Sequence, residues 1–320
     1  MPPPRCLVRG SINVDEFFQV QEFVQPGQTI SSNDLVKRLG GKGANQSVAI
    51  ARAGGLVDFV GAVGSDGLWV KDELKVAGVN VEGMLLVKEN TGRAIIQVNA
   101  AGENSIILFK GANYTSISPQ KIHSDTTHMV FQNEVPLQST IEFLTSAASS
   151  NIATVFNPSP MPTRNELQSF PWNQLTWLIV NEGEVSELCT MLDLAVPQQS
   201  TSPNKAAQSL VLTLSIRIPS TNIVCTLGAD GVIAKFCLFP ETVHVPAAQL
   251  SGPPLDTTGA GDCFTGYLVA GLMKLGSTAT ISEYLQVLQR ATKAAGMCVE
   301  KAGAASSIPL GIDVDVRMNE

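Results

Sequence analysis

Asp256-Thr257-Thr258-Gly259-Ala260-Gly261-Asp262 is the most informative stretch of this sequence, because small residues lead there into a run apolar enough for a helix, Cys263 through Leu275. Small residues let the backbone turn tightly, so the N–H groups of residues 259–262 can converge on one point. The dipole of the following helix adds positive potential at that point. The stretch therefore predicts an anion-binding hole at the start of a helix.

Asp262 stands beside this predicted anion hole. A carboxylate there can take the proton from a hydroxyl group, while the N–H groups of Gly259, Ala260 and Gly261 hold the charge that develops on a transferred phosphoryl group. In the alternative interpretation, Thr258 caps the helix and Asp262 only complements its dipole. Both interpretations stay open on this stretch alone.

The rest of the chain alternates short strand-like apolar runs with longer helix-like ones, which is typical of an α/β protein with a mostly parallel sheet. Residues 194–220, rich in Ser, Thr, Pro and Gln, indicate a variable surface connection. We expect strands near residues 6–8, 57–63, 129–132, 153–157, 177–181 and 223–227. We expect helices near residues 42–54, 67–77, 137–149, 183–193, 204–214, 260–275 and 281–300.

Two segments, residues 16–39 and 92–110, lack apolar residues at helix-length spacing. Apolar residues within 94–98 and 105–109 flank a polar turn at 99–104, which indicates a β-hairpin. The two segments can pair into a small sheet apart from the main one, and a lid is its functional interpretation. The alternative is a plain antiparallel edge of the main sheet, because two-residue periodicity does not fix where strands pair.

The composition limits the class of protein. Of the 320 residues, 44% are hydrophobic and 15% are charged, which predicts a large core and excludes a disordered, collagen-like or coiled-coil chain. The net charge of −7 argues against nucleic acid as a partner. A phosphate-bearing substrate would then need local N–H groups, a metal ion or a few lysines.

Targeting and redox signals are also informative. No apolar run reaches the length of a membrane span, and the N-terminus lacks the apolar core of a signal peptide, so no membrane partner is expected. Six scattered cysteines without a Cys-x-x-Cys motif indicate reduced thiols. We therefore expect a cytoplasmic protein, with the nucleus as a further compartment if the source is eukaryotic. The three histidines show no ligand-like spacing, so no zinc site is expected.

Two motifs in the first half suit a polyhydroxylated ligand. Gly40–Gln46 leads into the predicted helix 42–54 without the spacing of a Walker A loop, and Lys42 and Asn45 offer hydrogen-bond donors beside exposed backbone. The alternative is a glycine turn that only serves helix packing. Asn13 and Asp15 follow the first strand, where ligands of open α/β sheets bind. Such a pair can hold vicinal hydroxyls, unless it forms an ordinary Asx turn.

Two weaker motifs lie in the second half of the chain. Asn181–Glu184 follows a strand and opens a helix, so it can orient metal-bound waters or phosphate. Thr226–Gly231 closes another strand and can wrap a nucleotide. Helix capping or a hairpin turn explains each motif equally well in isolation.

In this order and spacing, the motifs resemble the ribokinase family of sugar kinases, within the wider ribokinase and adenosine kinase group. The resemblance runs from Gly10–Asn13 to Gly303–Pro309, with Gly-Gly-Lys-Gly-Ala-Asn at 40–45 and Asp-Thr-x-Gly-Ala-Gly-Asp at 256–262 as its specific signatures. It implies one three-layer, Rossmann-like α/β domain over residues 1–320, with a central, mostly parallel sheet. It also implies a β-sheet lid formed from about 16–39 and 92–110, and a homodimer formed through the lids.

The resemblance also assigns roles to residues, with ribose and ATP as substrates and Mg²⁺ accompanying ATP. Asp262 is the implied catalytic base, and Gly259, Ala260 and Gly261 form the implied anion hole. The implied ribose-binding residues are Asn13, Asp15, Gly41, Lys42, Gly43, Ala44, Asn45, Glu134 and Asp262. The implied nucleotide and phosphate–magnesium residues are Asn181, Glu184, Thr226, Leu227, Gly228, Ala229, Asp230, Gly231, Gly261 and Thr292.

A potassium ion beside the anion hole is a further implication of the resemblance. It would order two loops without touching substrate, and Cys298 and Lys301 need supply only carbonyl oxygens. Two alternatives stay open: Asp256 only caps its turn, or the ammonium group of Lys301 folds inward and replaces the ion. The matching positions are Asp256, Thr258, Cys298, Lys301, Gly303 and Ser307.

Two departures from the family pattern stand out. Arg9 occupies a strand position that the family usually fills with an apolar residue, which indicates either snorkelling or weakened packing. Residues 194–220 match poorly, which leaves the adenine side of the nucleotide site less defined.

The implied reaction is ATP-dependent phosphorylation of D-ribose at its 5-hydroxyl, which gives ribose 5-phosphate. One alternative is a kinase of the same fold that acts on deoxyribose, fructose, pseudouridine or a nucleoside. A nucleoside kinase needs lid residues that stack on a base, and the candidates here are Phe17, Phe18, Phe23 and Phe109. Another alternative is an inactive kinase-like scaffold, whose mark would be loss of the base, and Asp262 is present.

Overall fold

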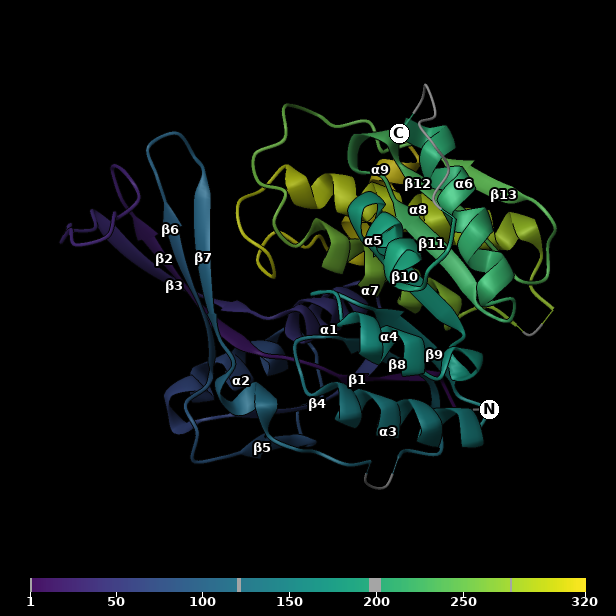
Figure 1. The fold of residues 1–320 in the computed structure, drawn as a ribbon, viewed down its shortest axis with the longest axis horizontal. Coiled ribbons are helices and arrows are strands. Elements are labelled where there is room, and N and C mark those ends of the chain that lie inside the picture. Colours follow the sequence, from purple (N-terminus) through teal and green to yellow (C-terminus); the bar gives the residue numbers. More distant parts are fainter. Residues whose placement is uncertain (1, 120–121, 196–202, 277) are drawn as a thin grey trace.

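The computed structural model describes residues 2–119, 122–195, 203–276 and 278–320, and it places them in a large α/β body and a small projecting sheet (Figure 1). The body is built on a nine-stranded sheet of order β13-β12-β11-β10-β9-β8-β1-β4-β5. Neighbouring strands from β11 to β5 pair in parallel, and β12 and β13 continue the sheet antiparallel. In that order the strands span Thr242–Val245, Val232–Lys235, Asn222–Thr226, Trp177–Asn181, Ala153–Asn157, Thr126–Gln132, Arg5–Arg9, Leu56–Val63 and Met84–Leu86.

Helices cover both faces of this sheet, because its buried strands turn apolar side chains to both sides. Val8 packs in one core with α1, α2, α7 and α8, while its neighbour Leu7 packs in the other with α3, α5 and α6. The predicted mostly parallel α/β architecture is therefore confirmed. The helices α1 to α9 span Lys42–Arg52, Leu68–Val76, Leu137–Ser149, Arg164–Ser169, Glu182–Met191, Pro203–Arg217, Ala260–Leu272, Ile281–Val299 and Gly311–Met318. Among the helices that the structure describes, none is both long and apolar enough to cross a membrane.

The prediction of a surface connection over residues 194–220 is wrong for most of that segment. Helix α6 occupies Pro203–Arg217, as the separate helix expectation for 204–214 had it. Its apolar residues recur at helical spacing and are buried against the sheet, which the Ser- and Gln-rich composition obscured. These buried residues are Ala207, Leu210, Val211 and Leu214. The part of the segment at 196–202 lies outside the described residues.

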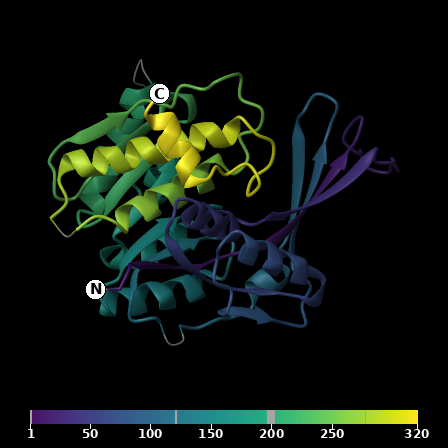
Figure 2. The same cartoon turned by 180° about the vertical axis from the view of Figure 1, so that it is seen from behind.

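The small sheet stands apart from the body, as both views show (Figure 1, Figure 2). Its order is β3-β2-β6-β7, with strands at Asp34–Gly40, Asn13–Gln19, Gly92–Val98 and Asn104–Phe109. The predicted hairpin is confirmed, since β6 and β7 pair antiparallel, and the alternative of an edge to the main sheet is wrong. Where the small sheet meets the body, Asn13 pairs with both Gly40 and Gly92.

Arg9 does not snorkel to the surface, because its side chain is fully buried in the body. Its Nε donates to Ser139 Oγ at 3.1 Å, and its Nη1 donates weakly to the carbonyl oxygen of Gly10 at 3.4 Å. Burial lowers the pKa of Arg9 to about 10. The guanidinium thus ties the end of β1 to the start of α3.

Candidate active site

The residues of the predicted anion hole lie where α7 begins. Gly259 precedes the helix with φ of 77°, a left-handed conformation that glycine adopts at little cost. A Cβ atom here would lie 2.8 Å from the Cα of Ala304, so the C-terminal loop packs directly against this turn. The first N–H groups of any helix lack acceptors within it. At the start of α7, Gly259, Gly261 and Asp262 line a polar cavity of 250 Å³, while the N–H of Ala260 donates weakly to the carbonyl oxygen of Thr257 at 3.3 Å.

Asp262 is held by a neighbouring helix rather than by its own. Only 6% of the residue is exposed, and it lies in the first turn of α7. Asn45 Nδ2 donates to its Oδ2 at 3.0 Å, and Gln46 Nε2 donates to its Oδ1 at 2.9 Å. Both donors come from α1, so these two hydrogen bonds fix the orientation of the carboxylate in the cavity. Capping of α7 alone does not require such bonds to another helix.

Gln46 is a site residue that sequence reasoning missed, although it closes the motif at 40–46. Gln132 Nε2 donates to Gln46 Oε1 at 2.6 Å, which leaves the amide group of Gln46 facing Asp262. Its place next to Asn45, in the first turn of a helix, was the available signal.

A second polar group gathers where α1 begins. Glu134, which follows β8, accepts at Oε2 from the backbone N–H of Lys42 at 2.9 Å and from Ser11 Oγ at 2.5 Å. Gly41 has φ of 89°, and a Cβ there would lie 2.9 Å from the backbone nitrogen of Asn13. The glycine therefore lets the start of α1 approach β2, the strand that carries Asn13 and Asp15.

Asn113 was not expected at this site, yet it orients Asn13. Its Nδ2 donates to Asn13 Oδ1 at 2.7 Å, and its Oδ1 accepts from the backbone N–H of Ile12 at 2.9 Å. These contacts connect β2 to the turn after β7. The two segments are about 100 residues apart in the sequence, so no local pattern predicts the contact.

Gly43 and Ala44 shape the turn from inside. A Cβ at Gly43 would lie 2.6 Å from the Cα of Gly10, and the N–H of Ala44 donates to the carbonyl oxygen of Ser11 at 2.9 Å. The side chain of Ala44 is fully buried. The contact of these two residues with a sugar stays a prediction.

Charge accumulates between the two helix N-termini. Burial raises the pKa of Asp15 to about 7, and the nearby charges of Glu134 and Asp262 add to the effect. Its Oδ1 is buried and has no hydrogen-bond partner within the described structure. Burial alone would lower the pKa of Lys42, but the carboxylates of Asp262, Glu134 and Glu184 outweigh it and raise that pKa.

An apolar cavity of 540 Å³ adjoins the polar one, and the two share Asn181, Thr226, Thr257 and Gly261. Thr292 lines the apolar cavity, and its buried hydroxyl has no hydrogen-bond partner among the described residues. An apolar chamber with one polar handle, open to an anion hole, fits a nucleotide base and its phosphates. Its lining includes Gly228, Ala229, Gly231, Ala247, Leu250, Pro254, Phe264, Thr292, Ala295 and Val299. Leu227 and Asp230, predicted with their neighbours, do not line it.

Asn181 and Glu184 form a capping box at the start of α5. Asn181 Oδ1 accepts from the N–H of Glu184 at 2.8 Å, and Glu184 Oε2 accepts from the N–H of Asn181 at 2.9 Å. Both residues also line the polar cavity with Asp262. Thr226–Gly231 likewise forms the tight turn between β11 and β12. Capping and turn formation therefore account for the local geometry of both motifs, and their role in binding ATP and its metal stays a prediction.

The residues matched to a monovalent cation lie on the loop before α7, at the end of α8 and on the loop that follows α8, and the two loops already touch. Asp256 accepts from the N–H of Thr258 at 2.9 Å and from the N–H of Gly303 at 2.8 Å. Ser307 Oγ lies 2.9 Å from Cys298 Sγ. Lys301 is exposed at the surface, so its ammonium does not fold inward to replace an ion.

An oriented carboxylate in a polar cavity at a helix N-terminus, with a larger apolar cavity beside it, is the arrangement of a small-molecule kinase. The model of the pfkB family carbohydrate kinases matches residues 4–310. The chain therefore belongs to the pfkB family of carbohydrate kinases.

Several relatives are similar over nearly their whole length. A ribokinase from Staphylococcus aureus is 31% identical and covers 96% of this chain and 97% of its own. A ribokinase from Schizosaccharomyces pombe is also 31% identical, with 98% and 97% covered. The crystal structure of ribokinase from Cryptococcus neoformans var. grubii, in complex with ADP, superposes with a TM-score of 0.89 at 46% identity, with 98% and 99% covered.

The crowded carboxyl group of Asp15 predicts a pH-dependent stability. A carboxyl whose pKa is raised on folding favours the folded state at low pH, and that contribution is lost as the pH rises through its folded pKa. Because folding raises this pKa from 3.8 to about 7, Asp15 destabilises the ligand-free protein increasingly between about pH 4 and pH 7, and the effect is constant above that range. Thermal unfolding across this range should show Asp15→Asn gaining in melting temperature over the wild type as pH rises. A difference between the two proteins that does not vary with pH would contradict the assigned environment.

Proposed function

We propose that this protein transfers the γ-phosphoryl group of ATP to the 5-hydroxyl of D-ribose, which yields ribose 5-phosphate. The observation that carries the proposal is the position of Asp262, fixed by Asn45 and Gln46 in the polar cavity at the start of α7. Relatives named ribokinase, similar from end to end, favour ribose over deoxyribose, fructose, pseudouridine or a nucleoside. The inactive scaffold is disfavoured because the carboxylate and both of its donors are in place.

Sugar recognition is assigned to the polar groups around the N-terminus of α1. Asp15 presents a buried oxygen without a partner, and carboxylates are strong acceptors for sugar hydroxyls. Asn13 and Asn45 each supply an oriented amide, and Lys42 supplies a cation among three carboxylates. The full proposed set is Asn13, Asp15, Gly41, Lys42, Gly43, Ala44, Asn45, Glu134 and Asp262.

In the proposed reaction Asp262 accepts the proton of the 5-hydroxyl as that oxygen attacks the phosphoryl group in line. The N–H groups of Gly259, Ala260 and Gly261 stabilise the charge that develops on the transferred group. Mg²⁺ bound with ATP neutralises phosphate charge, and Asn181 and Glu184 are the residues proposed to face it. Proton removal and positioning are therefore the protein's own contributions.

Replacing the base tests the reaction directly. Asp262→Asn keeps the shape but cannot accept a proton, so kcat should fall about 10²–10⁴-fold. Ribose binding, measured by calorimetry, should persist, and Asp313→Asn on α9 should behave as wild type. ADP release should depend on ribose and be weaker with deoxyribose, fructose or a nucleoside at equal concentration. Near wild-type kcat in Asp262→Asn would make the carboxylate a helix-dipole partner only.

We further propose a potassium ion held near the anion hole by Asp256, Thr258, Cys298, Lys301, Gly303 and Ser307. Carboxylate, carbonyl and hydroxyl oxygens suit a hard cation. The support is that Asp256 already bridges to Gly303, whose neighbour Ala304 packs against Gly259. An ion at this bridge would order both loops and so align the anion hole.

Exchange of the buffer cation tests this site. Activity should rise severalfold from a bulky organic cation to potassium at matched ionic strength, because the two loops become ordered. Asp256→Ala should abolish the response, whereas Asp72→Ala on α2 should preserve it. If the wild type has the same kcat in both buffers, the proposed potassium site is refuted.

We also propose that the small sheet is a lid that pairs with a second copy of the chain. Every residue of its edge strand β7 is exposed, including Ile106, Ile107, Leu108 and Phe109 at 49–60% each. An apolar edge strand of this kind normally lies against a partner. Sedimentation should show a wild-type dimer and a monomeric, folded Ile107→Lys/Leu108→Lys variant. A wild-type monomer, or a dimeric variant, would refute the interface.

The cytoplasm is the compartment proposed for this activity. All six cysteines are free thiols, five of them buried, which suits a reducing environment.

A further inference from the structure

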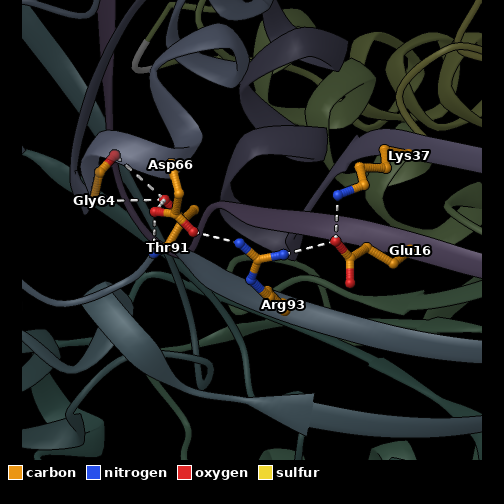
Figure 3. Close-up of polar contacts among 6 residues, drawn as sticks. All are labelled: Glu16, Lys37, Gly64, Asp66, Thr91 and Arg93. Atoms are coloured by element: carbon orange, nitrogen blue, oxygen red, sulfur yellow. Dashed lines mark hydrogen bonds and ion pairs between the residues drawn. The ribbon is translucent and has the colours of Figure 1, made fainter.

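A chain of alternating charges joins the small sheet to the body at its base (Figure 3). Arg93 on β6 donates through Nη1 to Glu16 Oε1 on β2 at 2.6 Å, and through Nη2 to Asp66 Oδ2. Lys37 on β3 lies 2.9 Å from the same oxygen of Glu16. Three strands of the small sheet are thereby linked to Asp66, which follows β4 in the body.

Asp66 is a fixed anchor. Its Oδ1 accepts from the N–H and from the hydroxyl of Thr91, each at 2.9 Å. The hydroxyl oxygen of Thr91 in turn accepts from the N–H of Gly64 at 3.0 Å. The other carboxylate oxygen of Asp66, Oδ2, accepts from the guanidinium of Arg93. The contacts with Thr91 therefore orient this acceptor before Arg93 binds it.

Among the ion pairs of the described chain, Arg93–Asp66 alone connects the small sheet to the body. Arg93 is 24% exposed and Asp66 is 26% exposed, so the contact is partly shielded from water. A guanidinium that bridges two carboxylates fixes direction as well as distance, since its donors are planar and rigid.

The bridge acts on the strand that carries the sugar-binding residues. Successive side chains of a strand point to opposite faces, so Glu16 faces Arg93 while Asp15 faces the candidate active site. A shift of β2 toward or away from Arg93 therefore moves Asp15 by a similar amount.

Repulsion adds to the load on this tether when Asp15 is ionised. Glu134 and Asp262 lie within interaction range of Asp15, and Asp15 belongs to the small sheet whereas the other two belong to the body. Coulomb repulsion between them favours movement of β2 away from the body. The Arg93–Asp66 contact on the opposite face resists that movement.

We propose that Arg93 is a positioning residue for ribose, which holds β2 through Glu16 and Asp66 so that Asn13 and Asp15 reach the sugar. The inference rests on the proposed function and assigns it a residue outside the substrate pocket. Arg93 lines neither the polar cavity at α7 nor the apolar cavity beside it, so its effect should be confined to sugar binding.

The test compares steady-state kinetics of Arg93→Met, Arg93→Lys, Asp66→Asn and the Arg93→Met/Asp66→Asn double variant with wild type. Loss of about 1–2 kcal/mol of positioning energy corresponds to a KM for ribose raised about 5–30-fold. The KM for ATP and kcat should stay at wild-type values. Arg93→Lys should recover part of the loss, because one ammonium reaches one carboxylate. The matched control Arg164→Met removes an exposed arginine–aspartate pair far from the site and should change nothing.

Asp66→Asn breaks only the Arg93–Asp66 contact, so it should reproduce a large part of the effect of Arg93→Met, which also loses Glu16. The double variant should be no worse than Arg93→Met, since that substitution already breaks the contact. A folded Arg93→Met enzyme with wild-type KM for ribose would overturn the inference, as would additive effects or a parallel rise in the KM for ATP. If Arg93→Met does not fold, Asp66→Asn carries the same comparison. A wild-type protein that neither binds nor phosphorylates ribose refutes the proposed function instead, and calorimetry of ribose binding separates the two failures.

Discussion

The close approach of α1 and α7 is the constraint on which the candidate active site depends. A Cβ at Gly266 would lie 2.3 Å from the Cβ of Ala49 and 2.8 Å from the carbonyl oxygen of Gln46, so only glycine permits this packing. Glycine weakens a helix interior by about 1 kcal/mol relative to alanine. Here the hydrogen bonds that the close packing permits offset this cost, because the packing brings Asn45 and Gln46 within hydrogen-bonding distance of Asp262.

Two helix N-termini meeting at one place also explain how several carboxylates can share a small volume. Asp262 lies in the first turn of α7, and Glu134 accepts from the first N–H of α1. The positive ends of both helix dipoles favour these anions, and Lys42 adds a full charge among them. Asp15 lies in no helix and has the strongly raised pKa, which shows the limit of this compensation.

Much of this architecture could be predicted because its signals are local. Apolar periodicity located the main strands and helices, and the change to two-residue alternation marked the small sheet. The helix α6 was obscured where polar composition was weighed above the spacing of Ala207, Leu210, Val211 and Leu214. The sequence did not indicate Ser11, Gln132 and Asn113 as residues that orient the site. Their hydrogen-bond partners are more than 80 residues away in sequence and come close only in the folded protein.

The unpartnered oxygen of Asp15 has a consequence for the lifetime of the protein in a cell. A buried acceptor without a donor destabilises the folded protein, and in the proposed complex a sugar hydroxyl would supply the missing hydrogen bond. A ligand that binds only the folded chain lowers the population of open forms that proteases attack. Abundance of the protein would then follow the supply of its sugar, without any change in synthesis.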